Sequence, residues 1–113
     1  MKTLITIILF LICFKSYSQD YTIVQINAVW NAKNNVKLPS KINGHKVVYG
    51  ILGEQPKSLR EKLKVVPVVI VYKETSPIAQ WNADISFKLN LTKEEIADVI
   101  EQDKQAHNAE RRN

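Results

Sequence analysis

Three apolar runs dominate the hydrophobic pattern of the chain and predict the strands of its core. They span Tyr21–Val29, Lys46–Leu52 and Val65–Tyr72, and each is rich in β-branched side chains. Runs that are apolar throughout, instead of alternating with polar residues, are typical of strands covered on both faces. Enough chain separates the first two runs for a crossover between parallel strands.

The segments around the second run predict short helical pieces and a turn. Residues 33–38 leave room for one or two helical turns before a proline limits anything longer. Asn43-Gly44 is a strong turn signal just before the second run. Beyond that run, Leu59 and Leu63 lie four residues apart among charged side chains, which predicts a short amphipathic helix beginning near Pro56.

The C-terminal part of the chain predicts a hairpin strand and a longer helix. Pro77–Trp81 is expected to pair back onto the third apolar run. Residues 82–91 alternate between apolar and polar side chains, which favours a short extended piece. Thr92 and Glu95 then form a capping box for a helix that is expected to end near Gln105. The polar tail from about residue 106 is expected to fray.

Together these elements predict an α/β domain with a mixed four-stranded sheet. Its first two strands are parallel, and the last two form a hairpin. Helices are expected on both faces of the sheet, because strands that are apolar throughout must be covered on both sides.

Residues 1–18 are expected to form a signal peptide. Lys2 precedes an apolar run of 11 residues, and small residues at Ser16 and Ser18 fit a cleavage site after Ser18. The run is too short to span a bilayer, although an uncleaved anchor stays an alternative. The mature domain would then span residues 19–113. We expect it in the periplasm or secreted, with no stable membrane insertion.

Removal of the signal peptide takes away Cys13, the only cysteine of the chain. The bulky Ile12 before this cysteine argues against a lipid-attachment site. Neither disulfide bonds nor thiol–disulfide catalysis are expected in the mature chain. Lys2 and Lys15 also leave, so the formal net charge falls from +5 to +3. The remaining basic residues form no stripe with interleaved aromatics, so no nucleic-acid partner is expected.

The order and spacing of four segments resemble a thioredoxin-like domain over roughly Thr22–Gln102. An apolar strand ends in Trp30 and is followed by Asn-Ala-Lys-Asn at positions 31–34, where the family has a Trp-Cys-x-x-Cys turn that opens a helix. A short helix then leads into Val65–Lys73. This resembles the family segment in which a cis-proline starts a strand beside the active site. The hairpin strand and the C-terminal helix complete the resemblance.

The departures from the family lie at its reactive positions. Both cysteine positions are asparagines, Asn31 and Asn34, the following helix is cut short by Pro39, and the hairpin turn lacks the usual glycine. An asparagine cannot act as the thiolate nucleophile or leaving group of a dithiol enzyme. Its side chain can accept hydrogen bonds from free backbone N–H groups, so Asn31 is expected to cap a helix.

Five residues are the candidates for holding a partner: Trp30, Asn31, Asn34, Val66 and Pro67. The resemblance implies a groove beside Pro67, where the backbone of Val66 could pair with an extended peptide if the bond between the two is cis. For each of these residues, a purely structural role is the alternative. The asparagines could serve only as caps, Trp30 could be partly buried, and Pro67 could be kept only for the fold. Trp81, on the hairpin strand, is expected in the core or covering the sheet.

The expected function is that of a non-catalytic, exported module that binds a protein or an extended peptide. A small structural or assembly subunit of an envelope complex is the alternative. No catalytic residue, cofactor or metal is expected, because no nucleophile motif is present and His45 and His107 are isolated.

Overall fold

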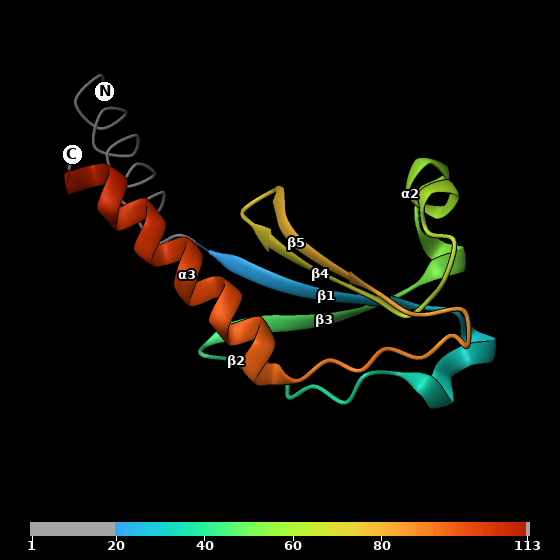
Figure 1. Ribbon diagram of the computed structural model, residues 1–113. Helices are drawn as coiled ribbons and strands as arrows, with labels where there is room; N and C mark the ends of the chain where they lie inside the picture. The colour runs from blue at the N-terminus through green and yellow to red at the C-terminus, as the bar shows by residue number, and fades with distance from the viewer. Residues whose placement is uncertain (1–19, 113) are drawn as a thin grey trace, which may run out of the picture.

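The computed structural model describes residues 20–112 as a mixed α/β fold built on a five-stranded sheet (Figure 1). The expected signal peptide, Cys13 included, lies outside these residues. The strands are β1 (Tyr21–Asn27), β2 (Lys41–Ile42), β3 (His45–Ile51), β4 (Val68–Lys73) and β5 (Ser76–Asn82), in the order β2-β3-β1-β4-β5. The helices are α2 (Lys57–Lys62) and α3 (Lys93–Arg112), with 3-10 turns η1 (Val29–Asn34) and η2 (Leu52–Glu54). No described helix is long and apolar enough to cross a membrane.

The pairing of the four longer strands follows the predicted pattern. β1 and β3 run parallel, with Val24 opposite Val48. β1 and β4 are antiparallel, with Val24 opposite Ile70, and β4 and β5 form the expected antiparallel hairpin. The parallel crossover and the mixed sheet are therefore confirmed. β1 lies in the middle of the sheet, between β3 and β4.

The prediction of four strands was wrong by one, because β2 was missed. This strand has only two residues and pairs antiparallel with the start of β3, Ile42 opposite His45. The turn between them is the predicted Asn43-Gly44, where both residues have positive φ (51° and 82°). Asparagine and glycine tolerate that conformation, which suits a two-residue hairpin loop. A strand of two residues is too short to show a hydrophobic pattern of its own.

The two faces of the sheet are covered by different helices. On one face, Ile96 and Ile100 of α3 pack with Ile23, Val69 and Val71 in the larger core cluster. The residues that alternate with these, among them Ile26, Val68 and Ile70, point to the opposite face. There they pack with Leu59 and Leu63, from α2 and its C-terminal end. Trp81 is half-buried and packs against the larger cluster, as expected.

Helix α3 begins as predicted and ends later than predicted. The Thr92 hydroxyl accepts from the backbone N–H of Glu95 (3.2 Å), and the Glu95 carboxylate accepts from the backbone N–H of Thr92 (3.4 Å). This is the reciprocal capping box. The helix continues past Gln105 to Arg112, because nothing between those positions interrupts it: neither proline nor glycine occurs there.

Two local predictions for the connecting segments were wrong. The helical turn expected at residues 33–38 lies instead at Val29–Asn34 and is of the 3-10 type. The extended piece expected at residues 82–91 is not a strand beyond Asn82. A turn interrupts the alternation, because Phe87 has a positive φ of 63° and its N–H donates to the Asp84 carbonyl (3.0 Å).

Candidate functional site

The C-terminal end of β1 and the turn η1 bring the five candidate residues into one region, at different depths. Trp30 is 67% exposed, and Asn34 is half-buried. Asn31 is 2% exposed, and Val66 and Pro67 are buried as well. The buried residues therefore offer little surface to a partner. Contact with another molecule falls mainly to Trp30 and the side chains around it.

Asn31 joins this turn to the proline-led strand. Its side-chain Nδ2 donates to the carbonyl oxygen of Val66 at 3.1 Å. The peptide bond between Val66 and Pro67 is cis, and Pro67 directly precedes β4. The backbone of Val66 was expected to be able to pair with a peptide, but its carbonyl already accepts a hydrogen bond from within the chain.

The buried side chains of this region form a network of amides. Asn31 Nδ2 also donates to Asn27 Oδ1 (3.0 Å) and to the Phe87 carbonyl (3.1 Å), while Asn31 Oδ1 accepts from Asn34 Nδ2 (2.7 Å). Asn27 Nδ2 donates to the Asn31 carbonyl (2.9 Å) and to Asn35 Oδ1 (2.6 Å). Buried polar groups need partners of this kind, since an unpaired one costs the full penalty of losing water.

The predicted capping role of Asn31 was wrong. The residue at the N-cap of η1 is Ala28, and no side chain caps the turn. Asn31 lies inside η1 with non-helical angles (φ −108°, ψ 16°). Its amide is already engaged by partners on three other segments, so it ties those segments together instead of ending a helix.

Gln25 and Asn27 were missed by the sequence analysis, although both belong to the site. Gln25 is fully buried and pairs with both backbone groups of Val36: Nε2 donates to the carbonyl (3.0 Å), and Oε1 accepts from the N–H (2.7 Å). The two residues lie two apart in an apolar strand, so they point to the same face. That spacing of amides was the available signal.

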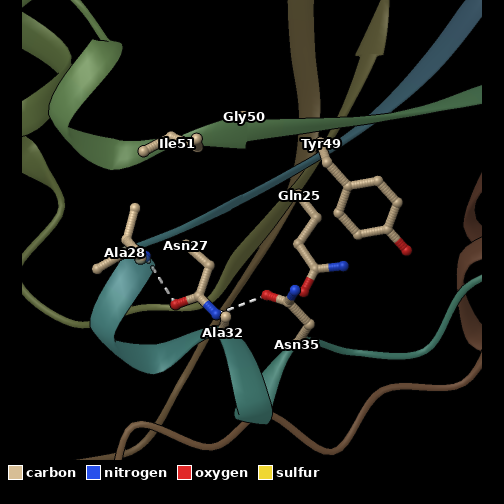
Figure 2. A pocket seen from close by; sticks show the side chains of 9 residues that line it. Gln25, Asn27, Ala28, Ala32, Asn35, Tyr49, Gly50 and Ile51 are labelled. Carbon is tan, nitrogen blue, oxygen red and sulfur yellow. Dashed lines mark hydrogen bonds between the residues drawn. The ribbon is translucent and has the colours of Figure 1, made fainter.

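Two neighbouring cavities lie beside the amide network. The first, of about 390 Å³, lies between η1 and β3 and is lined by Gln25, Asn27, Ala28, Val29, Ala32, Asn35, Tyr49, Gly50 and Ile51. Figure 2 shows Asn27 bonded to both Ala28 and Asn35, with the ring of Tyr49 beside Gln25. The second, of about 450 Å³, is lined by Ala28, Val29, Trp30, Ile51, Leu52, Gly53 and Arg60. Three residues line both cavities, so they form one hollowed surface.

The exposed large apolar side chains of the described residues gather on this surface. Val29 is 72% exposed, Trp30 67%, Tyr49 51% and Ile51 41%, and each lines at least one of the two cavities. Ile85 is also exposed and lines neither. A contiguous exposed apolar surface on a small domain is typical of a binding site.

The chemistry of this region is that of neutral amides and apolar side chains. An amide donates and accepts hydrogen bonds but neither titrates near neutral pH nor attacks a substrate as a base. Within the described part of the chain, no group of three or more His, Cys, Asp or Glu side chains is placed to hold a metal ion.

The side chains with shifted pKa values lie mainly at the other end of β1. The Tyr21 hydroxyl donates to Asp103 Oδ2 (2.5 Å), and Lys73 forms an ion pair with the same carboxylate (3.3 Å). Burial, followed by the bond to Asp103, raises the pKa of Tyr21. Burial alone would raise the pKa of Asp103, but hydrogen bonds from Tyr21 and Lys73 outweigh it and lower that pKa. This cluster holds α3 against the sheet.

Comparison with protein families and with curated proteins found no match for this chain.

Proposed function

We propose that this protein is an exported, non-catalytic module of thioredoxin-like fold that holds a protein or an extended peptide at the surface around Trp30. We place it in the periplasm or outside the cell. Trp30 and the half-buried Asn34 would contact the partner. The buried residues Asn31, Val66 and Pro67 would hold these two side chains in position.

The arrangement of the elements supports the thioredoxin-like part of this proposal. Strands β3, β1, β4 and β5 lie in that order, the first pair parallel and the others antiparallel, with helices on both faces. The turn after β1 touches the residue that precedes Pro67, through Asn31 and Val66. The resemblance to thioredoxin-like domains implies that these two segments lie next to each other.

One observation carries the binding role: an exposed tryptophan is held in place by the buried amides. Asn31 Nδ2 donates to the carbonyl of Phe87, and the ring of Phe87 packs edge-on against Trp30 (5.0 Å between centroids, 81° between planes). The indole keeps two-thirds of its surface free while it packs against the ring of Phe87. A rigid exposed aromatic side chain loses little entropy on binding, which is why tryptophan often dominates interfaces.

The proposal is tested by capturing partners from a native envelope extract with the immobilised protein. Trp30→Ala should lose most of the captured material, because the aromatic contact is removed. Ile85→Ala is the matched control, since Ile85 is 92% exposed but lines neither cavity. Equal capture by Trp30→Ala and the wild type would show that Trp30 is not part of the binding surface.

The non-catalytic part of the proposal has its own test. In an insulin-reduction assay, the exported protein should stay at the background rate, because the turn offers amides in place of thiols. A rate above background would contradict the proposal.

A further inference from the structure

The outer edge of β3 is covered over only part of its length. β2 pairs with His45 and Lys46, and the last bond on that side runs from the Val47 N–H to the Ser40 carbonyl (3.0 Å). Backbone groups alternate between the two edges of a strand, so those of Tyr49 face the same side as those of Val47. No described strand pairs with Tyr49 on that side.

The far end of this open edge is closed by a side chain. Gln55 Nε2 donates to the carbonyl of Ile51 at 3.0 Å, which satisfies the last acceptor of the strand. The open stretch is therefore short and centred on Tyr49. An unpaired strand edge is a template for another extended chain, because its N–H and C=O groups need partners.

Side chains on one face of an added strand would meet the hollowed apolar surface. Tyr49 and Ile51 are exposed on β3, and both line the first cavity together with Val29. Successive side chains of a strand point to opposite faces, so alternate residues of the added segment would face this cavity. Those residues should be apolar.

The charge of the chain is unevenly divided and favours an acidic occupant. Residues 28–64, which carry β3, η1 and α2, hold eight Lys or Arg and two Glu, a formal net charge of +6. Residues 65–113 hold six basic and eight acidic side chains, a net charge of −2. Lys46 of β3, Lys33 of η1 and Arg60, which lines the second cavity, are exposed, and the ion pairs of the described residues use none of them. Such a field attracts and orients negative partners.

We propose that the free edge of β3 at Tyr49 binds an acidic, extended polypeptide segment as an added strand, with its apolar side chains over the cavity lined by Val29, Tyr49 and Ile51. This inference rests on the proposed function and names its partner chemistry and docking strand. A second copy of this chain fits less well. Twofold pairing of two β3 edges would bring the same basic side chains together.

The probe is a short fluorescent peptide in which Glu alternates with Val and Phe, titrated against the exported protein by fluorescence anisotropy. It should bind, and more weakly as salt rises, because exposed charges are screened. The same peptide with Lys in place of Glu should not bind. Binding of the Lys peptide at equal strength would overturn the acidic assignment.

Tyr49→Pro tests the strand edge, because proline removes the outward N–H without touching the β1 side of β3. It should weaken binding by roughly tenfold or more, since at least one backbone hydrogen bond and its geometry are lost. Tyr49→Ser is the matched control: it loses the ring but keeps the N–H, and it should bind more tightly than Tyr49→Pro. Equal affinity of the two variants would overturn the edge-pairing inference.

A second measurement keeps the test independent of how Tyr49→Pro folds. The Glu peptide with N-methyl groups at alternate backbone nitrogens should lose binding in one of its two methylation registers and keep it in the other. If both methylated peptides still bind, strand addition is overturned. It is also overturned if the protein forms a dimer that the peptide does not dissociate. If the peptide fails but capture still depends on Trp30, the proposed function stands and this inference falls.

Discussion

The side-chain amide of Asn31 donates to the carbonyl oxygen of Val66, a residue 35 positions further along the chain, at 3.1 Å. The same nitrogen lies near two further acceptors, Asn27 Oδ1 and the Phe87 carbonyl. Three acceptors converge on one NH₂ group that is almost inaccessible to water. The fold at this end of the sheet therefore depends on a donor at position 31.

Asn31→Asp should destabilise the protein, because it replaces that donor with a carboxylate oxygen facing three acceptors. The expected loss in urea denaturation is about 3 kcal/mol at neutral pH. The new carboxyl would have a raised pKa in the fold, so part of the loss should be recovered on acidification, when it can donate again. Asn34→Asp, at a half-buried position, should cost clearly less. Equal losses for the two variants would contradict the central role of Asn31.

Val69→Asp should unfold the domain. Val69 is fully buried in β4, where it lies opposite Gln25 of β1 and Trp81 of β5. An unpaired charge at such a position costs several kcal/mol, which is a large part of the stability of a small domain. Circular dichroism should show loss of the native signal, whereas Gln80→Asp, exposed on β5, should keep it. A folded Val69→Asp protein would show that the position is not in the core.

Asp103 should make stability depend on pH in the acid range. Partial burial acts to raise its pKa, but hydrogen bonds from Tyr21 and Lys73 outweigh this effect and lower the pKa in the fold. The stabilisation is therefore present above its unfolded pKa of about 3.9 and is lost as pH falls further. Asp103→Asn should lower stability at pH 7 by about 1 kcal/mol, since the group is partly exposed, and should flatten this acid dependence. Asp98→Asn, exposed on the same helix, should stay within about 0.5 kcal/mol of the wild type.

His45 should contribute a second pH dependence, nearer to neutrality. Burial and then the nearby Lys104 lower its pKa, against smaller opposing effects of Asp20 and Glu101. Its Nε2 is buried without a partner among the described residues, and its ring packs edge-on against Tyr21 (5.1 Å). Because the folded state disfavours the charged form, stability should fall as pH drops below about 6.5.

His45→Phe is the variant that isolates this effect. Phenylalanine keeps an aromatic ring for Tyr21 and cannot be protonated, so stability between pH 7 and pH 5 should change less than in the wild type. The measurement is the urea midpoint at each pH. An unchanged slope in the variant would assign the pH dependence to another group.

The elements that could be predicted from the sequence are those whose causes lie close together along the chain. The capping box needs only Thr92 and Glu95, and the long strands need only their own apolar residues. Only the resemblance to a family indicated that the turn containing Asn31 would lie close to Pro67. The exposure of Trp30 could not be decided at all, because it depends on where Phe87 lies.

The failures have the opposite cause. Two of the partners of Asn31 lie 35 and 56 residues away, and the backbone partner of Gln25 lies 11 away, so no local sequence pattern predicts these bonds. The alternation after Asn82 predicted an extended piece, but a turn at Phe87 overrides it. β2 forms only because it pairs with β3, since two residues do not form a strand alone.

A turn built from side-chain amides exchanges neither protons nor electrons with whatever rests against it. A segment bound over this turn would meet no group there that could alter it covalently, and its occupancy would depend on its concentration, its fit and its charge. Acidification or oxidation would change the protonation or redox state of a dithiol turn. The amide side chains of Asn27, Asn31 and Asn35 have no thiol and no group that titrates near neutral pH, so they would not change.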